Sequence, residues 1–312
     1  MAEREKMLEV DHIRVEFGKK RHPFVAVDDV SFTIYKGETF GLVGESGSGK
    51  TTIGRAIIRA NPLAAGEIRL DGQRISGKLT PAEDRQVTRD VQMIFQDPMD
   101  SLNERAKVGY IVAEGLYAPG RHYTEEQRRD MVNKALSDVG LLPEFASRFP
   151  HEFSGGQRQR IGIARALILN PKFIVADEPI SALDVSIRAQ VLNLLARLQK
   201  ERGLTYLFIS HDLSVMRFIC DRIAVVHLGE IVELADTDTL YSHPLHPYTR
   251  ALLSAIPVPN PTVEKEKKLL VYDPSVHDYA KDAPVFTEIE PGHFVLGNQK
   301  ELDGYRERLA KG

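Results

Sequence analysis

Apolar and polar side chains alternate in the first part of the chain in a way that is typical of β-strands. Apolar residues recur along 8–17 and 25–34, and a further strand pattern at 38–43 ends in a glycine-rich stretch. From residue 52 onward the apolar positions change to helical spacing. The pattern therefore predicts two strands, then a third strand that leads through a tight turn into a helix.

Beyond this helix, strands and helices are predicted to alternate, with one interruption. Strand patterns are found at 66–72, 91–95, 173–176 and 204–209, and a hairpin at 222–235 turns at 228–230. Between 101 and 150 the pattern is helical, and 124–127 has the form of a capping box. We therefore expect an inserted helical subdomain, followed by a long amphipathic helix that Gly203 closes.

The composition shifts after residue 243. A short helix that begins with a proline is predicted within 243–253, and prolines break the pattern soon afterwards. Residues 263–268 form a charge run that is typical of a solvated linker. The remaining residues predict a small β-containing tail that ends in a polar helix.

The bulk composition is that of an ordinary soluble chain with one large or two smaller domains. The chain has 312 residues with a net charge of −3, so no global basic field points to nucleic acid. The single cysteine, Cys220, excludes an internal disulfide and a cysteine-ligated cluster within one chain. We find no apolar run long enough to span a bilayer and no secretion signal in the charged N-terminus.

The glycine-rich stretch matches the phosphate-binding template G-x-x-x-x-G-K-[ST] at every required position. Its residues are Gly44, Glu45, Ser46, Gly47, Ser48, Gly49, Lys50, Thr51 and Thr52. Glycines allow the backbone N–H groups to converge on phosphate oxygens, and the following helix adds a positive N-terminal end. Lys50 would place a cation at the β/γ-phosphates, and the Thr51 hydroxyl would bind Mg²⁺. The alternative is a chance Gly/Ser-rich turn.

Two adjacent carboxylates, Asp177 and Glu178, follow an apolar strand. Burying them is costly unless they meet a cation, and a phosphate site supplies one. Asp177 could hold Mg²⁺ through water, and Glu178 could polarise an attacking water. The alternative is an acidic cap between a strand and a loop.

Other polar candidates also lie at ends of predicted elements. Gln96 and His211 each follow a strand, where they could reach a metal, a nucleotide or the γ-phosphate. The ordinary alternatives are a solvated loop glutamine and a packing or surface histidine. Ser154, Gly155, Gly156 and Gln157 begin a helix, where they form either a second anion site or a simple junction. The ring of Phe17 could stack on adenine or pack in the β-layer.

The chain carries an ordered set of motifs that resembles the nucleotide-binding subunit of ATP-binding-cassette (ABC) transporters. The set consists of 44–52, Gln96, 153–157, Asp177-Glu178, 181–184 and His211. The resemblance covers roughly residues 8–255. Residues 243–257 resemble the C-terminal extension of oligopeptide/dipeptide permease ATPases, and 177–187 resemble their F-type subunit. The cysteine cluster that relatives often carry in this extension is missing, so an iron–sulfur site is not carried over.

The resemblance implies a fold and a division of the chain. We expect an α/β P-loop NTPase with a RecA-like core and an antiparallel β subdomain at 1–96 and 161–243. A helical signature subdomain is expected at 97–160, and the permease-type extension at 244–312.

The resemblance also implies roles for single residues. Residues 44–52 would bind the phosphates of ATP, and Phe17 would stack on adenine. Thr51 and Gln96 would bind Mg²⁺ directly, and Asp177 would do so through water. Glu178 would be the general base, and His211 would contact the γ-phosphate. Ser154, Gly155, Gly156 and Gln157 would close on ATP held by an opposing subunit.

The implied function is ATP hydrolysis that powers oligopeptide or dipeptide uptake across the cytoplasmic membrane. The implied partners are a homologous ATPase subunit in a head-to-tail heterodimer, two integral membrane permease subunits and, indirectly, a peptide-binding protein. The chain would then lie peripherally on the cytoplasmic face of the membrane, with no nucleic acid as ligand. The alternatives are an importer ATPase for another solute, such as nickel, or a soluble ABC protein outside transport. A GTPase switch is disfavoured, because this sequence has no guanine-reading Asn-Lys-x-Asp motif.

Overall fold

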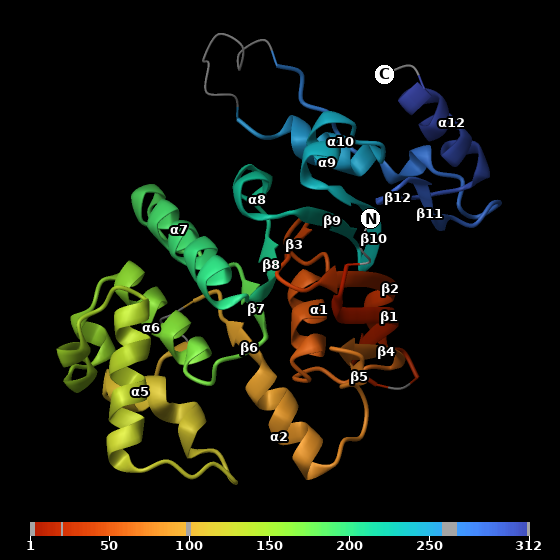
Figure 1. Cartoon of the computed structure of the whole chain (residues 1–312). Coiled ribbons are helices and arrows are strands. Elements are labelled where there is room, and N and C mark those ends of the chain that lie inside the picture. Colours follow the sequence, from red (N-terminus) through yellow and green to blue (C-terminus); the bar gives the residue numbers. More distant parts are fainter. Residues whose placement is uncertain (1–3, 20, 98–100, 258–266, 311–312) are drawn as a thin grey trace.

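A mixed β-sheet runs through the centre of the molecule (Figure 1). The computed structural model describes residues 4–19, 21–97, 101–257 and 267–310. Within these residues the strand order of the central sheet is β11-β12-β10-β9-β3-β8-β7-β6. Its strands are β3 (Thr39–Val43), β6 (Val91–Ile94), β7 (Phe173–Asp177), β8 (Thr205–Ser210), β9 (Arg222–His227), β10 (Glu230–Asp236), β11 (Val285–Glu290) and β12 (His293–Gly297).

The middle of this sheet is parallel and buried on both faces. The pairs β6/β7, β7/β8, β8/β3 and β3/β9 are parallel, whereas β9/β10, β10/β12 and β12/β11 are antiparallel. Every residue of β3, β7 and β8 is buried. Continuous apolar runs of this kind suit parallel strands that are covered on both faces. Phe40 and Leu42 of β3 face one core cluster, and Val43 faces the other.

A second, antiparallel sheet covers the first helix. Its order is β2-β1-β4-β5, with β1 (Lys6–Phe17), β2 (Phe24–Tyr35), β4 (Ala65–Leu70) and β5 (Gln73–Arg74). Helix α1 (Lys50–Ile57) packs between the two sheets, and its Ile53 and Ile57 are fully buried in the core that they share. The predicted strands at 8–17 and 25–34 are therefore confirmed, as is the strand–turn–helix order at the phosphate loop.

Between β6 and β7 the chain is helical, as the pattern predicted. This segment contains α4 (Val108–Ala113), η1 (Glu114–Tyr117), α5 (Glu125–Asp138), η2 (Pro143–Ser147), η3 (Pro150–Glu152) and α6 (Gly155–Leu167). Thr124 and Gln127 form the predicted capping box at the start of α5. Helix α2 (Pro81–Asp90), which has a capping box at Thr80, was not predicted from the sequence pattern. Only Val87 and Asp90 of α2 are buried, so too few apolar positions mark this helix in the sequence.

The second half of the core contains α7 (Val185–Arg202) and α8 (Leu213–Ile219). Gly203 ends α7 in the left-handed conformation with φ 64°, as expected for a glycine stop. The predicted hairpin at 222–235 forms β9 and β10. None of the helices within the described ranges combines the length and the apolarity that a bilayer span requires.

The C-terminal part contains α9 (Thr237–Ser242), α10 (Pro247–Ser254), η4 (Pro274–Val276), β11, β12 and α12 (Gln299–Ala310). The β-containing tail and its final helix are confirmed. The short helix predicted within 243–253 is confirmed as α10: it begins with a proline, Pro247, and the His246 side chain caps it. Most of the charged linker predicted at 263–268 lies outside the described residues. The division at 96/97, 160/161 and 243/244 stays a prediction.

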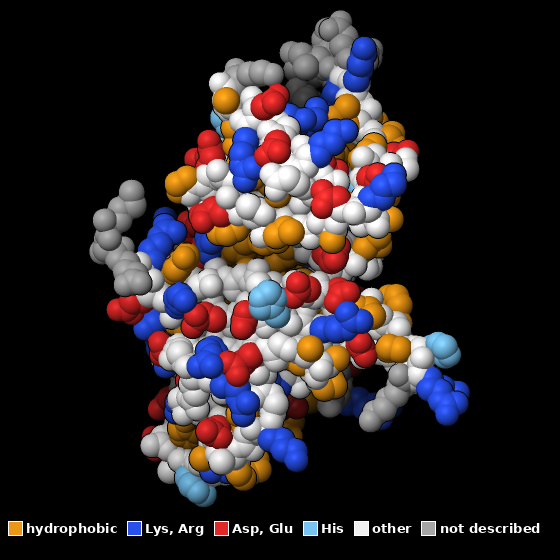
Figure 2. All heavy atoms as spheres, turned by 90° about the vertical axis from the view of Figure 1, so that its right-hand side faces the viewer, with side chains coloured by type: hydrophobic (Ala, Val, Ile, Leu, Met, Phe, Trp, Pro, Cys, Tyr) orange, Lys and Arg blue, Asp and Glu red, His pale blue; other side chains and the backbone are white. Residues whose placement is uncertain are grey.

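The strands of the C-terminal tail are part of the central sheet. β12 pairs with β10, so β11 and β12 extend the central sheet at one edge (Figure 1). Figure 2 shows the face on this side, where charges of both signs are interspersed and hydrophobic side chains gather in the waist below the C-terminal part. The joint is therefore made by main-chain pairing and by apolar packing.

A buried carboxylate, Glu233 on β10, fixes α10 to this edge. Its exposed fraction is 0%, and its two oxygens accept the N–H groups of Leu245 at 2.8 Å and His246 at 2.9 Å. The Nε2 atom of His293 on β12 lies 2.8 Å from the same carboxylate. A buried charge needs such partners, so Glu233 defines where the chain enters α10.

His246 makes the fold sensitive to acid. Its Nδ1 accepts the N–H of Tyr248 at 3.2 Å, and burial, helped by His277 and His227, lowers its pKa from 6.5 to about 3. Between these values the unfolded chain binds a proton that the folded chain does not. The free energy of unfolding should therefore fall as pH drops below 6.5, with a contribution of about 1.4 kcal/mol per pH unit from this residue.

His246→Asn keeps a side-chain acceptor for the cap but does not titrate. We expect this variant to lose roughly 2 kcal/mol less stability than the wild type between pH 7.5 and pH 5, measured by urea unfolding. The exposed His22→Asn variant is the control and should follow the wild type. An acid loss in His246→Asn equal to that of the wild type would contradict the assignment.

Candidate active site

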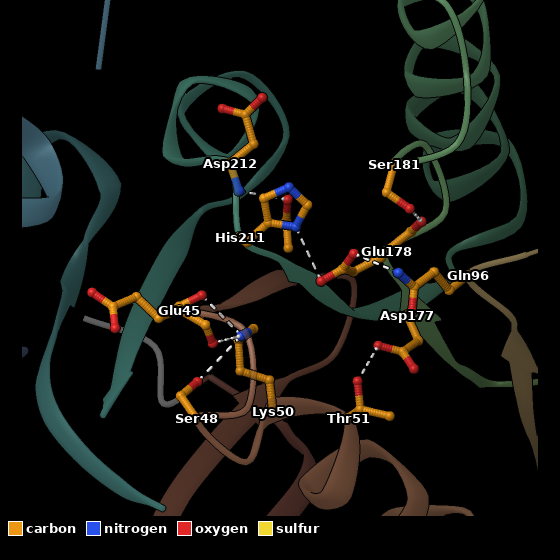
Figure 3. A network of polar contacts seen from close by, with 12 residues as sticks. Glu45, Ser48, Lys50, Thr51, Gln96, Asp177, Glu178, Ser181, His211 and Asp212 are labelled. Atoms are coloured by element: carbon orange, nitrogen blue, oxygen red, sulfur yellow. Dashed lines mark hydrogen bonds and ion pairs between the residues drawn. The ribbon is translucent and has the colours of Figure 1, made fainter. Parts of the chain in front are cut away.

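Four parallel strands deliver the predicted site residues to one edge of the sheet. β3 leads into the phosphate loop, and β6 is followed by Gln96. β7 ends at Asp177, and β8 is followed by His211. Because neighbouring parallel strands end on the same side of the sheet, segments that are up to 167 residues apart, from Gly44 to His211, meet there. Figure 3 shows these side chains facing one another.

The phosphate loop is held open by glycines and by Lys50. Gly47 and Gly49 have φ of 82° and 105°, a region that disfavours side chains. The Lys50 Nζ atom donates to the carbonyl oxygens of Gly44 at 2.8 Å and Glu45 at 2.6 Å, and lies 3.2 Å from the Ser48 Oγ atom. Burial lowers the pKa of Lys50, and the neighbouring carboxylates oppose this shift. The loop therefore encircles a buried ammonium group.

Asp177 lies directly behind the loop. The Oδ1 atom of Asp177 accepts a hydrogen bond from the Thr51 hydroxyl at 2.9 Å, and Asp177 is only 3% exposed. Burial raises the pKa of Asp177, the Thr51 hydrogen bond lowers it, and Glu178 raises it further. A carboxylate in this position gains from a cation placed next to it.

Glu178 lies at the mouth of the site between two polar neighbours. Its Oε2 accepts from Gln96 Nε2 at 2.9 Å, and its Oε1 lies 3.1 Å from His211 Nδ1 (Figure 3). Its backbone has φ 45°, which is uncommon for a residue with a side chain and is often found at functional sites. Ser181 donates to the Glu178 carbonyl at 3.0 Å. The carboxylate is thus oriented from both sides.

These residues surround a cleft of ≈ 790 Å³. The cleft brings together most of the predicted residues: Phe17, Gly44, Glu45, Ser46, Gly47, Gly49, Lys50, Thr51, Thr52, Gln96, Glu178 and His211. Ser48 and Asp177 support it from behind through Lys50 and Thr51. Ser154, Gly155, Gly156 and Gln157 do not line it. Gly155 begins α6, which Ser154 caps, and Ser154 is exposed elsewhere on the chain.

Three further residues line the cleft and were not predicted from the sequence: Phe24, Ala26 and Leu252. Phe24 pairs with Phe17 across the β1/β2 hairpin, and strand pairing across the turn would have indicated this neighbour. Leu252 lies on α10, more than 200 residues from the phosphate loop. No local pattern marks it, because its position depends on how the C-terminal part docks.

The residues fit a nucleotide with Mg²⁺. The first N–H groups of α1 have no acceptor within the helix and open to the cleft, as a phosphate requires. The hydroxyl of Thr51, the amide oxygen of Gln96 and the carboxylate of Asp177 are hard oxygen ligands of the kind that Mg²⁺ prefers. The rings of Phe17 and Phe24 also line the cleft and offer an apolar wall.

Solved structures define the class of this fold and site. A dimeric post-hydrolysis structure of the ATP-binding cassette MJ0796 bound to ADP and Pi matches with a TM-score of 0.66 and 30% identity, and covers 74% of this chain and 99% of that chain. The ADP conformation of MJ1267, an ATP-binding cassette of an ABC transporter, matches with a TM-score of 0.65 and 27% identity, over 77% and 96%. The fold is that of an ABC ATP-binding cassette with a P-loop nucleotide site.

Sequence comparison narrows this class. The family described as ABC transporter matches residues 27–181, and the family described as oligopeptide/dipeptide transporter, C-terminal region, matches 232–282. The chain is 58% identical to the oligopeptide transport ATP-binding protein OppF of Streptococcus pyogenes serotype M1, over 98% of this chain and 99% of the relative. It is 59% identical to AmiF of Streptococcus pneumoniae serotype 4 and 50% identical to the dipeptide transport protein DppF of Lactococcus lactis subsp. cremoris, with the same shares covered.

The chain therefore belongs to the family of oligopeptide transport ATP-binding proteins of ABC transporters. This confirms the family resemblance, including its F-type branch, on the names that the relatives carry. These names favour the peptide branch over the alternatives of another solute or a function outside transport.

Gly44 tests the geometry of the loop. A Cβ atom at this position would overlap the carbonyl oxygen of Val226 on β9, so Gly44→Ala has to displace the start of the loop. We expect nucleotide affinity to fall by about tenfold or more, as for an overpacked site. Fluorescence titration with ATP measures this change.

The matched control for this prediction is Gly162→Ala in α6, where an added Cβ meets no heavy atom within 4 Å. The control variant should bind nucleotide as the wild type does. Wild-type affinity in Gly44→Ala would show that the loop tolerates the displacement.

Proposed function

We propose that this chain is the ATP-hydrolysing subunit of an importer that drives uptake of oligopeptides or dipeptides across the cytoplasmic membrane. The observation that carries the proposal is the position of the Glu178 carboxylate, held between Gln96 and His211 at the mouth of the phosphate-loop cleft. The names of the relatives, over nearly the full length of the chain, support the peptide cargo.

In this proposal the phosphates of ATP lie on the N–H groups of 44–52, and Lys50 neutralises their charge. Lys50 would exchange its contacts with the loop carbonyls for contacts with phosphate oxygens. The adenine base of ATP would stack on the ring of Phe17. Thr51, Gln96 and Asp177 would hold Mg²⁺, which supplies further charge neutralisation at the phosphates.

Glu178 would accept a proton from the attacking water. His211 would contact the γ-phosphate, and its contact with Glu178 at 3.1 Å would orient the carboxylate. Gln96 donates its amide N–H to Glu178, which leaves the amide oxygen of Gln96 for the metal. Metal binding and base orientation would thus share one side chain.

A head-to-tail pair of subunits would complete each site. Ser154 caps α6 by accepting the N–H of Gln157 at 3.4 Å, and the Gln157 side chain accepts the N–H of Ser154 at 3.0 Å. This helix start is exposed and lies outside the cleft of its own chain, so it is available to phosphates held by a homologous ATPase subunit. The assembled pair would act on two membrane permease subunits from the cytoplasmic face, with a peptide-binding protein delivering cargo.

The role of Glu178 can be tested by Glu178→Gln. The amide cannot accept the proton, so turnover should fall by roughly 10²–10⁴-fold while Mg-ATP binding stays within a few-fold of the wild type. ATPase assays of the assembled transporter and equilibrium binding to the chain measure the two effects separately.

The control for this variant is Glu201→Gln, an exposed residue of α7 that pairs with Arg197 at 2.9 Å. This control should hydrolyse ATP at the wild-type rate. Wild-type turnover in Glu178→Gln would assign the base to another group.

The role of the α6 start can be tested by Ser154→Asp against Ser154→Asn. Both replacements can cap the helix, but only Asp places a negative charge where the opposing γ-phosphate would lie. In a Glu178→Gln background, ATP-dependent association with the homologous subunit should be lost with Asp and retained with Asn. Size-exclusion chromatography with and without ATP measures this, and an Asp variant that associates normally would refute the head-to-tail arrangement.

A further inference from the structure

Helix α10 of the C-terminal part lies against the phosphate loop. The ring of Tyr248, on the first turn of α10, is buried with an exposed fraction of 1%. Its hydroxyl accepts a hydrogen bond from the N–H of Glu45 at 3.1 Å, across 203 positions of sequence. Glu45 is the second residue of the phosphate loop, so the C-terminal part directly holds the main chain that is to receive phosphate.

One turn further along, the same helix reaches the cleft itself. Leu252 is four residues after Tyr248, so the two side chains lie on one face of α10. Leu252 lines the cleft together with Phe17 and Phe24 of the β1/β2 hairpin. The apolar wall is thus made by residues from both ends of the chain.

The position of α10 is fixed independently of any nucleotide. Glu233 on β10 binds the N–H groups that lead into the helix, as described above. The Tyr248 ring packs on His227 at 4.1 Å and on Tyr272 at 5.3 Å between ring centroids. Burial raises the pKa of Tyr248 to about 12, so its hydroxyl stays neutral beside the phosphate site at physiological pH.

The second half of the loop has a separate support. The N–H of Gly229, in the β9/β10 turn, donates to the Ser48 carbonyl at 2.9 Å, and the Gly229 carbonyl accepts from the N–H of Asp28 at 3.0 Å. Loss of the Tyr248 hydroxyl would therefore remove one support from the start of the loop, where the Lys50 contacts with the Gly44 and Glu45 carbonyls remain, while its other half stays in place. The packing of the ring would also remain in a phenylalanine variant.

We propose that Tyr248 is a positioning residue of the nucleotide site, and that Leu252 completes the wall for the nucleoside. The Tyr248 hydroxyl holds the Glu45 N–H so that the loop is pre-shaped for phosphate before ATP arrives, and the C-terminal part is a component of the nucleotide cleft. This inference rests on the proposed function, because it concerns how the same site binds ATP.

The test uses the full chain and three probes: Mg-ATP, tripolyphosphate and adenosine. Tyr248→Phe should weaken Mg-ATP and tripolyphosphate about tenfold each and leave adenosine unchanged. Leu252→Ala should weaken Mg-ATP and adenosine and leave tripolyphosphate unchanged. Competition with a fluorescent ATP analogue gives the affinities, and thermal unfolding without nucleotide is measured alongside.

Tyr206→Phe is the matched control. Tyr206 on β8 is 2% exposed, and its hydroxyl is buried without a hydrogen-bond partner among the described residues, so its removal should change neither affinity nor melting.

Two outcomes overturn the inference alone. One is wild-type affinity for all probes in Tyr248→Phe. The other is an equal loss for all three probes together with a lower melting temperature, which would give Tyr248 a packing role only. A wild-type chain that fails to bind Mg-ATP overturns the proposed function and this inference with it.

Discussion

The parallel pairing of β3 with β8, of β8 with β7 and of β7 with β6 is the constraint on which the site depends. It places the phosphate loop, His211, the acidic pair and Gln96 at one edge of the sheet, where each strand ends. The apolar interior of these strands keeps the edge rigid, because both faces of the sheet are covered. Polar groups whose burial would be costly without a partner hydrogen-bond to one another there, as Thr51 and Asp177 do.

Charged groups of both signs in the site have polar partners within the chain. Lys50 turns back onto the carbonyls of its own loop, and Glu178 is held by Gln96 and His211. These contacts satisfy the groups while leaving the cleft open. They are weaker bonds for Lys50 than phosphate oxygens would provide, so the arrangement favours a polyanion.

The C-terminal part is continuous with this machinery. Its strands extend the central sheet through β10, and Glu233 fixes α10 beside the phosphate loop. By contrast, the start of α6 lies away from the cleft. The chain thus contributes α10 of its C-terminal part to its own site and presents the start of α6 to its surroundings.

Local patterns along the chain were sufficient to predict several elements. These are the strands at 8–17 and 25–34, the loop at 44–52 and the capping box at Thr124. Gln96, Glu178 and His211, which the sequence places directly after strands, line the cleft beside the loop, and their roles stay predictions. Helix α2 was not predicted, because few buried apolar positions mark it.

Three features have no local signature in the sequence: the hydrogen bond between Tyr248 and Glu45, the place of Leu252 in the cleft and the pairing of the tail strands with the central sheet. The physical reason is the separation along the chain between the residues that interact. Periodicity, caps and turns act within a few residues, whereas docking of α10 depends on a buried carboxylate and on strand pairing between segments far apart in the chain.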